Sequence, residues 1–296
     1  MTKFLISTLN GVTLAALYFI VASGFSLIFG VMRIVNLAHG SFYLLGAYLG
    51  WEVGDNAFKE WGWGATQAWL LALVVGAVTV IILGLAMQAG LFSWMQGQDL
   101  RQAMITIGIS IIVADQMFNR YGGFAKQFPI PGFLEGATDV PGLGIKYPIY
   151  RLSLIAMALA IGAGLWFVLA RTRLGMTIRA GIDDRDMLAA IGINVPRVFM
   201  IVFAIGAALA GIAGVVGGTA FSVIPLEDIR FLLASLVVVI VGGMGSLGGA
   251  AIAALLVAMA ENYGLAYYPT YSFLITFALM VLVLAVRPQG LLGRTA

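Results

Sequence analysis

Residues 171–197 read RTRLGMTIRAGIDDRDMLAAIGINVPR, a hydrophilic stretch set between two long apolar segments. These apolar segments, near 152–170 and 198–221, each have about the 20 residues that a helix needs to cross a bilayer. The stretch between them is rich in arginine, and loops rich in arginine or lysine stay on the cytoplasmic side of a membrane. The stretch therefore predicts a cytoplasmic loop that joins two membrane-spanning helices.

The composition extends this prediction to the whole chain. Of the 296 residues, 61% are hydrophobic and 10% are charged, whereas a soluble domain carries about 25% charged residues. Apolar segments follow one another along the chain, near 4–30, 35–51, 69–94, 102–119, 152–170, 198–221, 231–244, 248–266 and 272–286. We therefore predict an all-α fold, a polytopic transmembrane helix bundle of about eight or nine spans, in a single domain that covers residues 1–296.

Two of the apolar segments are poor candidates for lipid-facing spans. Segment 35–51 contains Asn36, His39 and Ser41, and segment 231–244 is short and runs into a cluster of glycines. Short or irregular helices at membrane depth are tolerated only where protein or water covers them. We therefore expect both segments to be short or broken and to lie in the interior. If all the segments cross, the N-terminus lies outside the cell; if one is re-entrant, it lies inside.

The chain lacks residues that several classes of enzyme and metalloprotein require. It has no cysteine and one histidine, which excludes disulfides, thiolate sites and multi-histidine metal sites. The run VIVGGMGSLGG at 239–249 is rich in glycine like a phosphate-binding loop, but no Gly-Lys-Ser/Thr occurs in the chain. Hydrolase motifs are absent too, and the net charge of +3 indicates membrane orientation rather than nucleic-acid binding. We predict no enzyme activity, metal or cofactor in this chain.

The hydrophilic stretch contains the pattern of a short amphipathic helix. Asp183 can cap its N-terminus, with Asp186 three residues on, and Gly192 can end it. The predicted apolar face consists of Met187, Leu188 and Ile191. Such a helix, about 12 Å long at 1.5 Å per residue, can transmit force from a soluble motor to the flanking spans. Alternatively, its apolar face rests on the lipid headgroups.

Polar side chains within segment 35–51 form a second candidate site. Asn36 and His39 are three residues apart, so on a helix they would share a face and could bind the carboxylate or ammonium group of a substrate. Alternatively, they satisfy backbone carbonyls where the chain breaks, and for the lone His39 we favour this structural role.

Asp115 is an ionisable residue inside segment 102–119, where burial of its charge costs at least about 2.5 kcal/mol. It is a candidate for a substrate or gating role, or it pairs with the neighbouring Arg120. Glu261 lies at the end of an apolar segment, and we expect it to face water.

Four stretches together carry a resemblance to a known family. They are GVMRIVNLAHGSFYLLGAY at 30–48, RAGIDDRDMLAAIGINVPRV at 179–198, VVVIVGGMGSLGGA at 237–250 and RPQGLLG at 287–293. Their order and spacing resemble those of the inner-membrane permease subunits of bacterial branched-chain (hydrophobic) amino-acid ABC importers. The resemblance covers essentially the whole chain and is to the shorter of the two permease types.

The resemblance implies a multi-pass protein of the bacterial inner membrane that acts with partners. These are a second permease subunit, two cytoplasmic subunits that bind ATP and Mg²⁺, and a periplasmic substrate-binding protein. It also implies that the loop at 171–197 holds the helix that couples the permease to an ATPase. The predicted coupling residues are Arg179, Asp183, Asp184, Met187, Leu188, Ile191 and Gly192. Our own expectation for the substrate pathway, which moves solute by alternating access, is Asn36, His39, Ser41 and Asp115.

Other functions remain open at this point. The same permease architecture serves importers of urea and short amides. An ion-coupled secondary transporter is a further alternative, and Asp115 would then be its coupling-ion site. A channel or a membrane scaffold is a more distant one.

Overall fold

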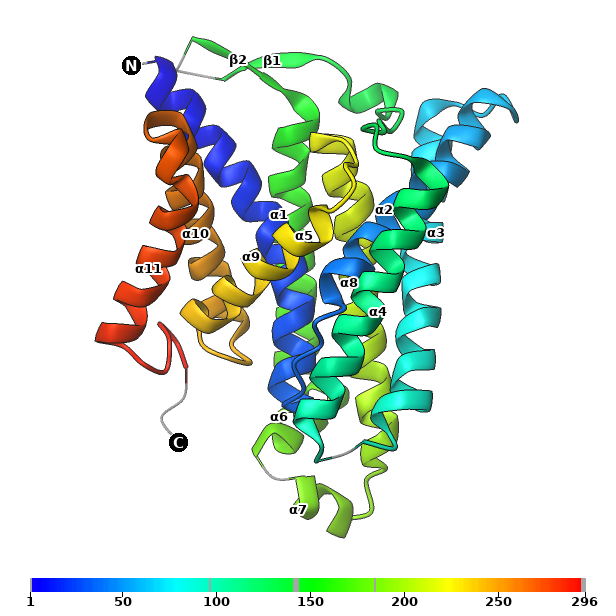
Figure 1. Ribbon diagram of the computed structural model, residues 1–296, viewed down its shortest axis with the longest axis vertical. Helices are drawn as coiled ribbons and strands as arrows, with labels where there is room; N and C mark the ends of the chain where they lie inside the picture. The colour runs from blue at the N-terminus through cyan, green and yellow to red at the C-terminus, as the bar shows by residue number, and fades with distance from the viewer. Residues whose placement is uncertain (1, 96, 141–143, 184, 294–296) are drawn as a thin grey trace.

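The computed structural model describes residues 2–95, 97–140, 144–183 and 185–293 and shows a bundle of helices (Figure 1). The helices are α1 (Thr2–Met32), α2 (His39–Lys59), α3 (Ala65–Met87), α4 (Asp99–Tyr121), α5 (Ile149–Arg171), α6 (Arg173–Asp183), α7 (Arg185–Ala190), α8 (Val195–Phe221), α9 (Glu227–Gly242), α10 (Leu247–Tyr267) and α11 (Ser272–Val286). Short helical turns lie at η1 (Gln88–Phe92), η2 (Gly132–Leu134) and η3 (Pro269–Tyr271).

Each predicted apolar segment corresponds to one helix, which confirms the helical bundle. Within the described residues, five helices are long and apolar enough to cross a membrane: α1, α3 continued by η1, α5, α8 and α10. The prediction that segments 35–51 and 231–244 lie in the interior is also confirmed, because the helices formed there, α2 and α9, bury most of their small and aromatic side chains.

A β-hairpin was not predicted. Strand β1 (Ala137–Val140) pairs antiparallel with β2 (Ile145–Pro148) at one end of the bundle. Tyr147 fixes the hairpin to α1, because its hydroxyl donates to Asn10 Oδ1 at 3.0 Å and lies 2.9 Å from Thr13 Oγ1. Among the described residues the fold is therefore helical, with a small hairpin at one end of the bundle.

Glycines allow the central helices to approach closely. Gly46 of α2, Gly76 of α3 and Gly211 of α8 meet at one point, where a Cβ added to Gly46 would lie 2.6 Å from the Cα of Gly211. A Cβ added to Gly211 would lie 2.6 Å from the carbonyl oxygen of Gly76. Small residues permit such contacts between helices in lipid, where van der Waals packing drives association.

Helices α2 and α9 both begin inside the bundle. Residues 33–38 run without helical structure before α2, and 222–226 do so before α9, whose diagonal course across the middle is visible in Figure 1. The two helix starts touch, since a Cβ on Gly40 would overlap the carbonyl oxygen of Asp228 and lie 2.9 Å from Leu232 Cβ. The bundle thus brings two helix beginnings together at its centre.

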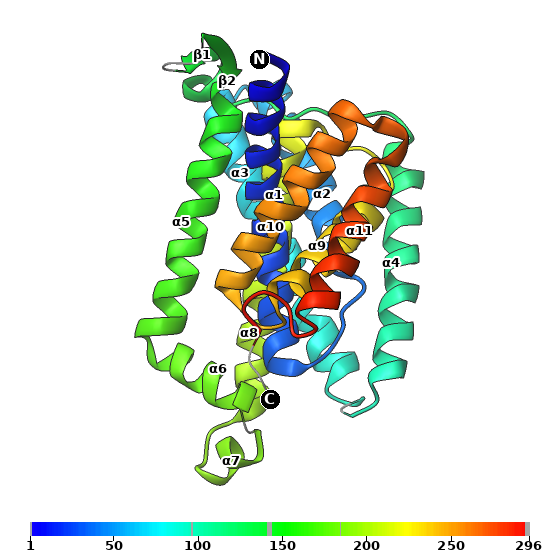
Figure 2. The same ribbon diagram turned by 90° about the vertical axis from the view of Figure 1, so that its left-hand side faces the viewer.

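The ends of the bundle separate the loops into two groups. The N-terminus, the β-hairpin and the α10–α11 connection lie at one end, whereas α6, α7 and the α3–α4 connection lie at the other (Figures 1 and 2). The N-terminus therefore lies opposite to the loop at 171–197, as an odd number of crossings between them requires.

Candidate functional site

One face of the bundle carries a groove with the start of α9 at its floor. In Figure 1, α10 and α11 lie on one side of α9 and α4 on the other. Two cavities flank the start of α9, one of about 410 Å³ toward α10 and α11 and one of about 520 Å³ toward α4. Both are lined in part by Leu226 and Ile229, whose side chains are more than half exposed. The start of α9 is therefore accessible from both sides of the groove.

The backbone before α9 is strained. Ser222 has φ +70° and Leu226 has φ +67°, in the left-handed region that residues with a Cβ rarely adopt. Each such residue costs about 1–3 kcal/mol and persists only where the surroundings enforce it. The left-handed conformation of these two residues allows the chain to turn away from α8 and begin α9 inside the bundle.

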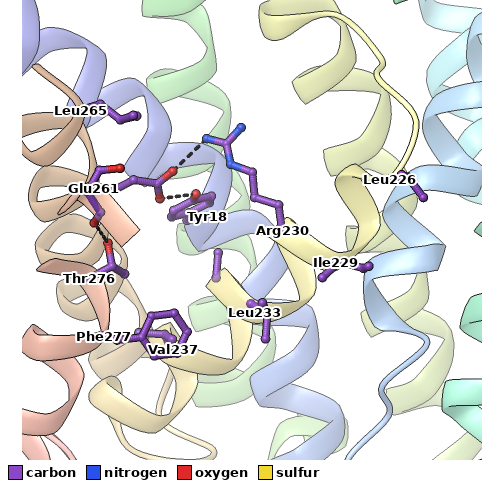
Figure 3. A pocket seen from close by; sticks show the side chains of 12 residues that line it. Tyr18, Leu226, Ile229, Arg230, Leu233, Val237, Glu261, Leu265, Thr276 and Phe277 are labelled. Carbon is purple, nitrogen blue, oxygen red and sulfur yellow. Dashed lines mark hydrogen bonds and ion pairs between the residues drawn. The ribbon is translucent and has the colours of Figure 1, made fainter. Parts of the chain in front are cut away.

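The cavity toward α10 and α11 contains a charged cluster from three helices (Figure 3). Glu261 of α10 accepts a hydrogen bond from the Tyr18 hydroxyl at 2.6 Å and pairs with the Arg230 guanidinium of α9 at 2.9 Å. Tyr18, near the middle of α1, is almost fully buried. The expectation that Glu261 faces water is therefore wrong: its side chain is 17% exposed and paired.

A second carboxylate completes the cluster. Glu227, one turn before Arg230 on α9, lies 3.4 Å from the guanidinium and is 13% exposed. Two carboxylates thus share one guanidinium, so the cluster carries a formal charge of −1 when all three groups are ionised. Arg230 itself exposes 45% of its side chain to the groove.

The cavity toward α4 has a different polar lining. Asp228, buried to 2% exposure, and Ser110 of α4 both line it. The hydroxyl of Ser41 donates to the Ser110 hydroxyl at 2.8 Å, which connects α2 to this wall. Asp228 Oδ1 is buried and has no hydrogen-bond partner among the described residues. A buried carboxylate oxygen without a hydrogen-bond partner costs free energy of folding, so this oxygen is a candidate for contact with solute or water.

The predicted pathway residues are only partly assembled in this groove. Asp115 lines the cavity toward α4, but it accepts a hydrogen bond from Asn119 at 3.0 Å, and the alternative pairing with Arg120 is wrong. Arg120 pairs instead with Glu52 at 2.7 Å. Ser41 reaches the cavity wall through Ser110, as described above.

Asn36 and His39 lie outside both cavities. Asn36 precedes α2, so the predicted common helical face does not form; its Oδ1 accepts from the Ala38 backbone N–H at 3.1 Å. His39 Nε2 donates to the Val21 carbonyl at 3.0 Å, and the ring packs against Phe25. His39 thus satisfies a backbone carbonyl, as the structural interpretation expects, and the pathway role assigned to it stays a prediction. Neither residue is exposed.

The hydrophilic stretch forms two helices rather than one. Asp183 is the last residue of α6, and α7 begins at Arg185; Asp184 lies outside the described residues, as do the side chains of 182–186, so the predicted capping by Asp183 falls on side chains that the structure does not describe. Gly192, with φ +83°, follows the end of α7 as predicted, and the Ile193 N–H bonds to the Leu188 carbonyl at 3.1 Å.

The predicted common face of α7 is wrong in part. Leu188 is buried at 2% exposure and faces Gly181 of α6, whereas Met187 and Ile191 are 61% and 62% exposed. The helix therefore presents two apolar side chains outward and anchors itself with the third. Arg179 fixes α6 to the preceding span, because its guanidinium donates to the Leu169 carbonyl at the end of α5.

Sequence reasoning missed the residues that line the groove most closely. Glu227, Asp228 and Arg230 immediately precede the short segment 231–244, and an ionisable residue at membrane depth indicates a functional site by default.

The comparisons with known proteins cover almost all of the chain. The family described as "Branched-chain amino acid transport system / permease component" matches residues 7–284. The chain is 29% identical over 299 residues to the high-affinity branched-chain amino acid transport system permease protein BraD of Pseudomonas aeruginosa, covering 98% of this chain and 96% of BraD.

Two further relatives distinguish the permease types. The chain is 30% identical over 308 residues to LivH of Escherichia coli K12, covering 98% of this chain and 96% of LivH. It is 28% identical over 312 residues to LivM of the same strain, covering 97% of this chain but 70% of the longer LivM. This chain thus belongs to the family of permease components of branched-chain amino acid transport systems, and it is of the shorter, LivH-like type.

Proposed function

We propose that this permease imports branched-chain amino acids across the bacterial inner membrane as part of an ATP-driven complex. The substrate moves along the groove that α9 floors, by alternating access between the two sides of the membrane. A second, LivM-like permease faces the groove, two subunits in the cytoplasm hydrolyse ATP with Mg²⁺, and a periplasmic protein delivers the substrate. The relatives are named as permease proteins of high-affinity branched-chain amino acid transport systems, which supports the substrate class and the permease role.

The observation that carries the proposal is a charged cluster at the middle of an apolar bundle, open on one face. Arg230 exposes 45% of its side chain, and an arginine at the centre of a membrane span costs at least about 2.5 kcal/mol against lipid. A face with this residue suits a water-filled pathway or a protein partner. The groove therefore fits the wall of a translocation pathway between two permeases.

The loop at 171–197 supports coupling to an ATPase. Helix α6 is tied to α5 through Arg179 and contacts α8, so a push on α6 and α7 reaches two spans. Met187 and Ile191 face outward, where an apolar cleft on an ATP-binding subunit can receive them. Their placement opposite to the N-terminus fits a cytoplasmic position for this loop.

Reconstitution of the complex tests the proposal. The chain, a second permease, two ATP-binding subunits and the binding protein are incorporated into proteoliposomes, and uptake of radiolabelled leucine is measured. Uptake that requires ATP and all partners is expected. Uptake that survives without ATP but stops when the proton gradient collapses would identify a secondary transporter. Uptake of urea without leucine would identify an amide permease.

A further inference from the structure

The cavity beside Arg230 is polar at one end and apolar at the other. Figure 3 shows Arg230, Glu261 and Tyr18 gathered at one end, with Leu233, Val237 and Phe277 at the opposite end. Its volume of about 410 Å³ lies at the small end of the range of about 300–1,000 Å³ for ligand cavities. The shape suits one small solute with a charged head and an apolar tail.

The charged end retains hydrogen-bonding capacity. A guanidinium has five N–H donors, and Arg230 directs one to Glu261 and one to Glu227. The two Glu261 oxygens each accept one hydrogen bond, from Tyr18 and Arg230, and each retains a further lone pair. The pair can therefore bind a carboxylate and an ammonium group at the same time without breaking.

We infer that this cavity binds the zwitterionic head of an aliphatic α-amino acid. Arg230 receives the carboxylate, Glu261 receives the ammonium group, and the side chain points toward Leu233 and Phe277. The inference rests on the proposed function and names its substrate site. It disfavours urea, which has no charged groups for the pair to bind.

A second cluster of the same chemistry provides a control. Glu52 pairs with Arg120 at 2.7 Å and accepts a hydrogen bond from the Tyr121 hydroxyl at 2.6 Å, as Glu261 does with Arg230 and Tyr18. Glu52 does not line the cavity beside Arg230. Loss of either glutamate removes one ion pair and one tyrosine hydrogen bond between helices, so an effect of that structural loss alone should appear in both variants.

The test is leucine binding to the purified importer complex without its binding protein. Competition by 4-methylpentanoate, which lacks the ammonium group, and by 3-methylbutylamine, which lacks the carboxylate, reports each charged contact. Glu261→Gln is expected to weaken leucine binding about 10- to 100-fold and to leave the affinity for 4-methylpentanoate nearly unchanged. Arg230→Gln is expected to weaken leucine binding by a similar factor and to leave the affinity for 3-methylbutylamine nearly unchanged. Glu52→Gln is expected to change none of the three affinities.

The outcomes separate the site from the function. The proposed site is overturned if Glu261→Gln weakens the binding of leucine and of both analogues equally, or if it behaves like Glu52→Gln. Leucine uptake by the native complex would still support the proposed function in that case. A native complex that neither binds nor imports leucine overturns the function itself. Leu233→Phe keeps the charged groups and narrows the apolar end of the cavity. It should therefore weaken leucine binding about tenfold and leave alanine binding unchanged. Equal loss for both amino acids would contradict the orientation.

Discussion

Replacement of Gly40 by alanine tests whether the contact between the starts of α2 and α9 sets the geometry of the groove. Gly40 is buried, and the new Cβ would overlap the carbonyl oxygen of Asp228 and lie 2.9 Å from both the Asp228 carbonyl carbon and Leu232 Cβ. Ordinary contacts of this kind begin at 3.4 Å. Because the nearest atom is the backbone carbonyl oxygen of Asp228, α9 as a whole must retreat by roughly 1 Å.

The structure gives the size of the expected effect. Overpacking of a well-packed interior typically costs about 1–3 kcal/mol, and the retreat of α9 also moves Arg230 relative to Glu261, now 2.9 Å apart. We expect Gly40→Ala to destabilise the chain by about 1–3 kcal/mol. A loss of about 1.4 kcal/mol at the cavity would weaken leucine binding about tenfold.

Gly164→Ala is the matched control. Gly164 lies in the middle of α5 and has nothing within 4 Å of an added Cβ, so alanine there should stabilise the helix by about 0.5–1 kcal/mol or leave it unchanged. Thermal unfolding and leucine uptake of the reconstituted importer are measured for both variants. If Gly40→Ala melts and transports like Gly164→Ala, the contact between α2 and α9 does not set the geometry of the groove.

Three further predictions concern other parts of the chain. Leu188→Pro should break α7 and abolish ATP-driven uptake, while the protein still inserts into the membrane and the ATPase stays active. Normal uptake by a well-expressed variant, measured in proteoliposomes, would contradict a coupling role. Asp228→Asn should preserve or raise the melting temperature, because a neutral amide costs less free energy to bury than a carboxylate. If the Asp228 charge serves the pathway, the variant should also take up leucine more slowly, and uptake at the native rate would exclude that role. Trp69→Phe removes the indole donor to Thr219, 3.0 Å away, and should cost about 0.5–1.5 kcal/mol in thermal unfolding without changing uptake; reduced uptake at native stability would be the contrary result.

The order of the helices could be predicted from the sequence because lipid imposes a simple rule. Every backbone polar group must be satisfied within the membrane, so apolar segments of sufficient length become helices. The same rule, applied to the polar residues of 35–51 and the shortness of 231–244, placed α2 and α9 in the interior. The β-hairpin escaped this reasoning because it lies outside the apolar segments and is held by Tyr147.

The candidate site could not be predicted because its pairs join residues far apart in the chain. Arg230 and Glu261 are 31 residues apart, and Tyr18 and Glu261 are 243 apart. Local spacing suggested Arg120 as the partner of Asp115, whereas Arg120 pairs with Glu52, 68 residues away. The roles assigned to the residues of α6 and α7 and to the predicted pathway stay predictions, since geometry alone does not test them.

Three of the four stretches that carry the family resemblance converge on α9, a helix of only 16 residues. The stretch at 30–48 contacts its start through Gly40, and 237–250 forms its end and the turn to α10. The stretch at 287–293 closes that end, because the N–H groups of Leu291 and Leu292 donate to the carbonyls of Val241 and Gly242 at 2.8 and 3.0 Å.

The last turn of a helix has backbone carbonyls without intrahelical hydrogen-bond donors, and at membrane depth water does not supply those donors. The segment at 287–293 thus supplies donors that a short helix inside a bundle requires. Helix α9 is held by backbone contacts at both ends, while its first turn carries Ile229 and Arg230 into the groove. A helix fixed at two ends can tilt only when the elements at those ends move, which would link the groove to motions of α2 and of the C-terminal segment.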